Sequence, residues 1–244
     1  WKLVSFGGDV QDSAIVLSAT DGAAAGHGFT VGGSVRSSSL SHTIAAGSGV
    51  GSSFTISGAI VASAVETSGG RYSQTATFGG PVADSNLTMT DVSIAQSFSL
   101  AGAMEGSNLT MTGVTVTQSV SIGSTGSDLR INMTDCSVGT AEANSYTKAL
   151  QFFTGSIADV DVLIANCSIF TDDSDDHAIV FGGNVSNCQV SFTGSVAVSG
   201  ATTFSGDLSN SAVTMSGTSW KLVSFGGDVQ DSAIVLSATD GAAA

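Results

Sequence analysis

Asparagine is the residue type whose surroundings most directly indicate covalent chemistry. Five of the eight asparagines begin an N-x-S/T sequon, the acceptor for N-glycans in secreted and cell-surface proteins. Sequons also arise by chance in a chain this rich in serine and threonine, which is the alternative. The predicted glycosylation sites are Asn86, Asn108, Asn132, Asn166 and Asn184.

Two of the three cysteines could form a bond with each other. Cys136 in MTDCSV and Cys167 in IANCSI fall at the same position of two consecutive repeat units, described below. If these units stack as rungs, the two Cα atoms lie about 4.8 Å apart, a distance that a disulfide tolerates. A Cys136–Cys167 disulfide is one prediction, and two stacked small hydrophobic residues are the alternative. Cys188 is expected to be a buried free thiol.

The acidic run TDDSDDH at 171–177 is the candidate metal site. Its carboxylates would supply the oxygen ligands that Ca²⁺ prefers. The run matches neither an EF-hand loop nor a GGxGxD repeat, so an unliganded, solvated loop is favoured and calcium is the alternative. The candidate ligands are Asp172, Asp173, Asp175 and Asp176.

The sequence shows no catalytic constellation. A glycan-cleaving solenoid needs clustered carboxylates with a Lys or Arg on one outer face. The arginines Arg36, Arg71 and Arg130 fall in different units, without paired carboxylates at matching positions, and Asp159 and Asp161 lack a basic partner. No nucleophile elbow is present, and the three histidines are expected to be structural. We therefore predict that the protein is not an enzyme and needs no cofactor other than covalent glycans.

The charge balance excludes two classes of partner. The net charge is −14, and the six basic residues form no cluster. Nucleic acids and anionic membranes are bound through basic patches, so neither is expected as a partner. No apolar stretch approaches the length of a membrane-spanning helix, so membrane insertion is not expected. With 42% hydrophobic and 11% charged residues, the chain is predicted to fold rather than to remain disordered.

The elements that must position these residues follow from repetition at two scales. Residues 1–25 reappear unchanged as residues 220–244, which gives a long period of 219 residues. We interpret residues 1–219 as one full period and residues 220–244 as the start of the next identical one, within a longer tandem array. That interpretation expects Gly, and then HGFTVGG, to follow Ala244. A duplication introduced by cloning is the alternative.

Nine shorter units of about 24 residues fill the long period, and three columns of equivalent residues define them. The anchor column is Phe6, Val31, Ile56, Phe78, Leu100, Ile122, Phe153, Phe181, Phe204 and Phe225. The aliphatic column, nine residues after each anchor, is Ile15, Leu40, Val65, Leu87, Leu109, Ile131, Val162, Val190 and Val213. The serine column, seven residues after each anchor, is Ser13, Ser38, Ser63, Ser85, Ser107, Leu129, Val160, Cys188 and Ser211.

These columns predict the fold. Because side chains alternate across a strand, the small or apolar columns of one parity face inward and the intervening polar columns face water. A unit this short cannot bury its own apolar side, but stacking units in register does. The sequence therefore predicts an all-β parallel β-helix (β-solenoid) with about nine coils per period. An antiparallel sandwich and a propeller are the alternatives. A propeller blade needs about 40 to 45 residues, and a sandwich gives no reason for a column kept constant through nine units.

Three local features complete this interpretation. Insertions at 137–148 and 168–177 are expected outside the strands, and 141–153 is the single candidate helix. Outward threonines also form TxT pairs in consecutive units, as in ice-binding solenoids. Two of them belong to sequons, however, and glycans there would disrupt a flat face. The pairs are Thr88 with Thr90 and Thr110 with Thr112.

The stretches MTDCSV, VLIANCSIF and NVSNCQVSFTGSVAVSG resemble the degenerate β-helix repeats of pectin-lyase-like surface proteins. The similarity covers mainly residues 75–215 and is closest to the dispersed-gene-family surface proteins of kinetoplastid protists. This resemblance implies a secreted, glycosylated, non-enzymatic surface role, and it transfers no functional residue.

The sequence thus predicts a structural role outside the cell. We expect a repeat segment of an extracellular, glycosylated fibre or cell-surface filament. Its expected partner is itself, through tandem repetition and end-to-end stacking of coils. A surface adhesin or glycan-binding solenoid is the main alternative, followed by a carbohydrate-active enzyme and an ice-binding solenoid.

Overall fold

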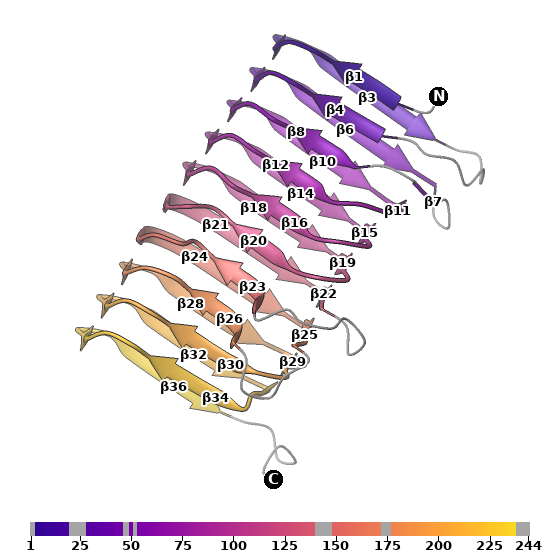
Figure 1. Ribbon diagram of the computed structural model, residues 1–244. Coiled ribbons are helices and arrows are strands. Elements are labelled where there is room, and N and C mark those ends of the chain that lie inside the picture. The colour runs from indigo at the N-terminus through magenta and orange to yellow at the C-terminus, as the bar shows by residue number, and fades with distance from the viewer. Residues whose placement is uncertain are drawn as a thin grey trace.

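The chain folds into a regular stack of β-coils, with the N-terminal coils at the top of Figure 1 and the C-terminal coils at the bottom. The computed structural model describes residues 3–19, 28–45, 49–50, 53–139, 148–171 and 177–237. Within these ranges there are strands and turns but no helix, and all the sheets are parallel. The predicted β-solenoid is confirmed, with about nine turns and coils of roughly 23 residues.

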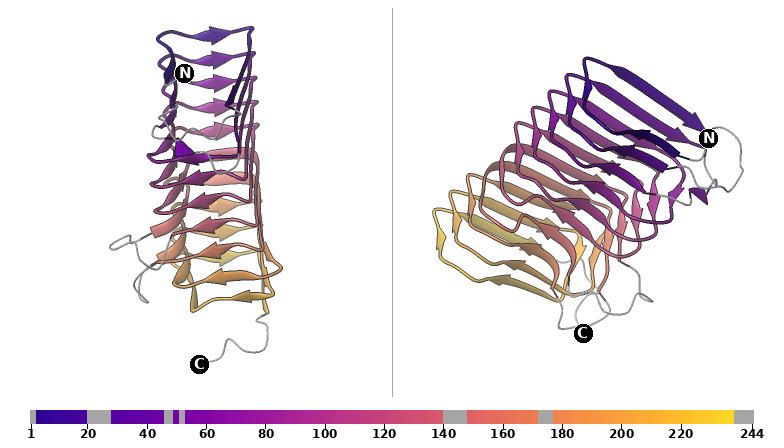
Figure 2. Two further views of the ribbon diagram at one scale, coloured as in Figure 1. Left: turned by 90° about the vertical axis from the view of Figure 1, so that its right-hand side faces the viewer. Right: turned by 45° about the horizontal axis from the view of Figure 1, so that its top comes forward.

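Three sheets run along the stack, and Figure 2 shows their strands aligned from coil to coil. The first sheet has ten strands. In chain order these are β1 (Leu3–Phe6), β4 (Gly28–Val31), β8 (Phe54–Ile56), β12 (Ala76–Phe78), β16 (Phe98–Leu100), β20 (Val120–Ile122), β23 (Lys148–Phe152), β26 (His177–Phe181), β30 (Ala201–Phe204) and β34 (Leu222–Phe225).

The second sheet bends within each coil, so most coils contribute a two-residue strand followed by a longer one. The short strands are β2 (Val10–Gln11), β5 (Val35–Arg36), β9 (Ile60–Val61), β13 (Val82–Ala83), β17 (Met104–Glu105), β27 (Val185–Ser186), β31 (Leu208–Ser209) and β35 (Val229–Gln230). The longer strands are β3 (Ala14–Ala19), β6 (Ser39–Ile44), β10 (Ala64–Ser68), β14 (Asn86–Thr90), β18 (Asn108–Thr112), β28 (Gln189–Thr193), β32 (Ala212–Ser216) and β36 (Ala233–Ser237). Two strands run through the bend, β21 (Gly126–Thr134) and β24 (Ile157–Ala165).

The third sheet consists of very short strands, which carry too few residues to show a period in the sequence. They are β7 (Gly49–Val50), β11 (Arg71–Tyr72), β15 (Ser93–Ile94), β19 (Thr115–Val116), β22 (Ser137–Val138), β25 (Ser168–Ile169), β29 (Val196–Val198) and β33 (Thr218–Ser219).

Two local predictions are wrong. In the described part of the candidate helix at 141–153, residues 148–152 form the strand β23 (Lys148–Phe152), and residues 141–147 lie outside the described ranges. The insertions at 137–148 and 168–177 were expected outside the strands, yet β22 and β25 open them. Pairing with neighbouring coils decides both cases, because each of these strands finds a parallel partner on either side.

Register is kept from coil to coil. Every pair of neighbours in the aliphatic column is a pair of register partners, from Ile15 with Leu40 to Val190 with Val213. The anchor column is wrong at one place, where Phe152 rather than Phe153 pairs with Ile122. Phe153 is one extra residue after the strand, with a φ of 48°. Because of this extra residue, the aliphatic column is in register again at Val162.

Each coil makes the same left-handed bend within the second sheet. The residue six places after the anchor, or its structural equivalent, has φ between 47° and 57° in all ten coils. Eight of these residues are Asp, Asn or Gly, the types that enter this region most easily. We call them the turn column: Asp12, Ser37, Ala62, Asp84, Gly106, Asp128, Asp159, Asn187, Asn210 and Asp231.

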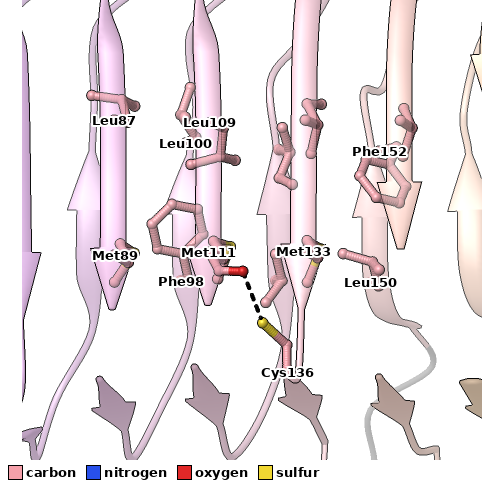
Figure 3. Packing of buried hydrophobic residues seen from close by; sticks show 14 of the residues in the cluster. Leu87, Met89, Phe98, Leu100, Leu109, Met111, Met133, Cys136, Leu150 and Phe152 are labelled. Carbon is pink, nitrogen blue, oxygen red and sulfur yellow. Dashed lines mark hydrogen bonds between the residues drawn. The ribbon is translucent and has the colours of Figure 1, made fainter. Parts of the chain in front are cut away.

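The interior is a continuous apolar stack. Figure 3 shows Leu87 over Leu109 and Met89 over Met111 and Met133, with each of these side chains at most 2% exposed. The aliphatic column is buried from Leu40 to Val213, and Ile15 packs against it partly buried. Burying an aliphatic side chain of this size contributes about 1.5–3 kcal/mol, so the column stabilises every coil that it passes through.

Truncating the column in mid-stack should be costly. Ile131→Ala removes a side chain that is 0% exposed, and we expect it to lower the free energy of unfolding by about 2–5 kcal/mol. Thr110→Ala is the control, because its side chain points outward on the neighbouring strand, and it should change stability by about 0.5 kcal/mol or less. Urea unfolding followed by circular dichroism would measure both. Equal effects of the two substitutions would contradict the inward orientation of the column.

Candidate functional site

The predicted glycosylation sites lie on the outside of the solenoid. Asn86, Asn108, Asn166 and Asn184 are exposed, and Asn132 is half-buried on the outer side of β21. All five side chains are therefore accessible at least in part, as N-glycan attachment requires.

Two of the sequons form a single polar pair. Asn86 and Asn108 are register partners on β14 and β18, whose sequences are both NLTMT. The Nδ2 of Asn108 donates a hydrogen bond to the Oδ1 of Asn86 over 2.8 Å. Glycans attach at Nδ2, the atom of Asn108 that donates this bond. A glycan on Asn108 would replace one of the two hydrogens of that nitrogen. One rung of spacing, about 4.8 Å, also leaves little room for two glycans side by side.

Two other sequons cap turns of the next coil. The Oδ1 of Asn166 accepts from the backbone N–H of Ser195, and the Oδ1 of Asn184 accepts from that of Asp207. Both bonds use the oxygen, so the amide nitrogen stays available for a glycan. Asn166 also has a φ of 53°, a conformation that asparagine tolerates well.

The serine column is a hydrogen-bonded ladder inside the bend of the second sheet. The backbone N–H of Ser63 donates to the Oγ of Ser85 over 3.1 Å, and that Oγ donates to the carbonyl of Ala83 over 2.6 Å. The same pair of bonds recurs where Ser38 and Ser107 occupy the column, with the N–H groups of Ser13 and Ser85 as the donors. Each serine thus closes the turn of its own coil and ties it to the coil before. The sequence predicted these residues to be inward and small, but nothing in it signalled the ladder.

All three cysteines are buried free thiols, so the predicted Cys136–Cys167 disulfide is not formed in this structure. The Sγ of Cys167 instead accepts from the backbone N–H of Cys136 over 3.4 Å. The Sγ of Cys136 donates to the carbonyl of Met111, the bond drawn in Figure 3. Both thiols therefore link coils as the serines do. Cys188 is the buried free thiol that the sequence predicts.

The environments of these thiols make them poor nucleophiles. Burial raises the pKa of Cys188, and the side-chain hydrogen bond with Cys167, followed by burial, raises that of Cys136. The same side-chain hydrogen bond lowers the pKa of Cys167, whose side chain is nevertheless 0% exposed. Since the thiolate is the reactive form and must be reached by a reagent, none of the three resembles a catalytic cysteine.

One prediction about the charged residues is wrong. Arg130 and Asp161 occupy matching positions on β21 and β24 and lie 3.6 Å apart, so Asp161 does have a basic partner. Their side chains are 71% and 55% exposed, and a pair this exposed contributes little to stability. With Asp128 and Asp159 they line a shallow surface hollow. The side chains Asp159 and Asp161 are both exposed there.

The candidate metal ligands and one of the three histidines, His27, lie outside the described residues. The calcium candidates Asp172, Asp173, Asp175 and Asp176 lie outside the described residues. Among the described residues, no three His, Cys, Asp or Glu side chains are grouped to hold a metal ion. His42 is buried on the inward column, where its Nδ1 lies 2.6 Å from the Tyr72 hydroxyl, as a structural histidine would.

The junction between the last coil of the long period and the coil that repeats the first one is a regular pair of coils. We call this junction the seam; it joins the ninth coil (residues 201–216) to the tenth (residues 222–237). Its strands pair in register on both main sheets. The rings of Phe204 and Phe225 stack across it at 5.1 Å and 9°, continuing a ladder from Phe152 and Phe181.

The duplicated segment uses two different edges in its two locations. In the tenth coil it meets the ninth through the N–H groups of Gly226 and Ala233 and the carbonyls of Asp228 and Gln230. In the first coil the same sequence meets the second through the N–H groups of Val10 and Asp12, which correspond to neither donor. The two sets of backbone groups do not overlap, so one coil of this sequence can hold a neighbour on each side at once.

Comparisons with known proteins add little. No family model matches the chain, and no curated protein matches it. One similar solved structure is that of a TibC-catalyzed hyper-glycosylated TibA fragment, which is 14% identical over 99% of each chain. Its TM-score is 0.17, too low to carry an argument about this protein. These comparisons give no link to kinetoplastid surface proteins. The described part of the chain contains no helix that could cross a membrane.

Breaking one rung of the serine ladder should destabilise the stack. Ser85→Ala leaves the buried N–H of Ser63 without its acceptor, and we expect a loss of about 1–3 kcal/mol in the free energy of unfolding. Ser85→Cys is the matched control, because Cys188 already occupies this column, and it should cost clearly less. Thermal and urea unfolding of the two variants would decide. If both lost the same stability, the ladder bonds would not be the cause.

Proposed function

We propose that this chain is a structural repeat segment of an extracellular, glycosylated fibre or cell-surface filament. The observation that carries the proposal is the seam. The same sequence is seen once with a neighbour on one edge and once with a neighbour on the other. An array of period 219 needs a coil that accepts both neighbours together, and the separate sets of backbone donors meet that need.

The interior supports a mechanical role. The aliphatic column and the parallel backbone bonds continue through the ninth coil into the tenth without a change of register. Stacked repeats of this kind gain stability from every interface between neighbours. A covalent tandem array would therefore extend one rod, and its length would scale with the number of periods.

The outer surface supports an extracellular location. All five sequons are at least partly accessible. The acidic surface and the lack of a basic cluster favour a soluble rod with no nucleic-acid partner. The proposed partner is a further copy of the same repeat, and the proposal involves no catalysis and no cofactor beyond N-glycans.

A surface adhesin or glycan-binding solenoid is the second candidate. The shallow hollow beside Arg130 and Asp161 is the observation that favours it, because it offers exposed polar groups on the outer face. The proposed similarity to kinetoplastid surface proteins rests only on the resemblance of residues 75–215 to their β-helix repeats.

Rod length tests the fibre proposal. A chain carrying residues 1–219 twice, followed by 220–244, should form one unbranched rod. Nine more coils at about 4.8 Å each make it roughly 43 Å longer than the present chain. Negative-stain images or small-angle scattering would give the length. Two beads joined by a linker would contradict the proposal.

Glycan occupancy tests the location. Expressed through a eukaryotic secretory pathway, the protein should gain mass that a glycosidase specific for N-glycans removes. Asn184→Gln should remove one glycan, because Asn184 is exposed and its nitrogen is free for attachment. Asn144→Gln is the control, since Asn144 is outside a sequon and its substitution should leave the mass of the glycans unchanged. An intact mass without any shift would count against a glycosylated fibre.

A further inference from the structure

The seam shows what the end of the ninth coil recognises. Its contacts fall on residues 222–237, through β34, β35 and β36. Residues 3–18 have the same sequence, residue for residue. The ninth coil therefore meets, in its own chain, a segment that a second copy of the chain also carries.

We infer that the ninth coil also binds residues 3–18 of a second copy in place of its own residues 222–237, so that separate chains join end to end by exchange of this coil. The inference rests on the proposed function and adds a non-covalent route to the same rod. It identifies the partner as a second copy and fixes the register. Thr214, which pairs with Val235 in its own chain, would pair with Val16 of the second copy.

The contacts at the exchanged interface would equal those at the seam. Phe6 of the incoming copy would stack on Phe204 as Phe225 does, because Phe6 and Phe225 are equivalent. The incoming coil would also keep its own second coil. It holds that coil through Val10 and Asp12, whereas the seam uses the groups equivalent to Gly226 and Ala233. The backbone bonds of Val10 and Asp12 to the second coil can therefore stay in place.

Competition within the chain limits the exchange. The chain's own tenth coil is tethered beside the ninth and so has a high effective concentration, whereas the second copy must diffuse to it. Domain exchange between identical elements is a recognised route to assembly, and it becomes favourable when the tethered element is weakened. Weakening the tenth coil alone should therefore increase exchange.

A disulfide trap on the full chain tests the inference. One chain carries Thr214→Cys and a second, mass-labelled chain carries Val16→Cys. In the predicted register these positions are neighbours on adjacent rungs, with Cα atoms about 4.8 Å apart, within disulfide reach. The native thiols are at most 3% exposed, so they should not compete. Oxidation of the mixture should give a mixed dimer on a non-reducing gel.

Two matched variants should change the yield of mixed dimer in opposite directions. Phe225→Ala in the Thr214→Cys chain weakens only the tethered coil and should raise the yield of mixed dimer several-fold. Phe6→Ala in the Val16→Cys chain weakens only the incoming coil and should return the yield to the background. That background is set by pairing Thr214→Cys with Ser5→Cys, which lies on a different sheet.

The result separates the two proposals. A mixed dimer no more abundant than the Ser5→Cys background, or one that does not respond to Phe225→Ala, would overturn exchange. Circular dichroism of each variant would show that the remaining coils are folded. If tandem chains still form longer rods, the fibre proposal stands without exchange, because covalent continuity alone would join its coils.

Discussion

The repeated left-handed bend is the constraint on which the rest of this structure depends. One residue in each of ten coils takes a φ near 50°, and the serine column follows directly after it. The bend turns the chain between the two parts of the second sheet at the same place in every coil. Because the bends coincide, the backbone groups on either side meet their partners in the next coil, and the apolar side chains stack.

The interior contains both apolar packing and hydrogen bonds, and the hydrogen bonds of the serine column lie at the bend. The aliphatic column supplies burial, and the serine column satisfies backbone groups that the bend would otherwise leave unpaired. Where the column changes to Leu129 and Val160, the two short strands merge with the longer ones into β21 and β24. A slip of one residue between coils would turn the aliphatic column toward solvent and would also break the serine ladder, so both hold the register.

The duplicated segment pairs with a neighbour on one edge in the first coil and on the other edge in the tenth. A single coil sequence that accepts one neighbour on each edge has no intrinsic end. In the proposed fibre, such a sequence would let the rod grow by repetition, and it would let another molecule supply the same coil. The outer sequons would then recur along the rod once per period.

The sequence by itself determined the solenoid, because alternation and a constant column depend on nearest neighbours along the strand and on stacking in register. It placed the aliphatic column correctly in every coil, including Val162 beyond a misplaced anchor. Only the tertiary structure decided the register at Phe152, the third sheet and the strand in place of a helix at Lys148–Phe152, because pairing between coils outweighs local propensity there. It also decided that the Cys136 and Cys167 thiols bond to backbone groups instead of to each other and that Arg130 meets Asp161, since the pattern gives the rung and the face of a side chain but not the group that it contacts.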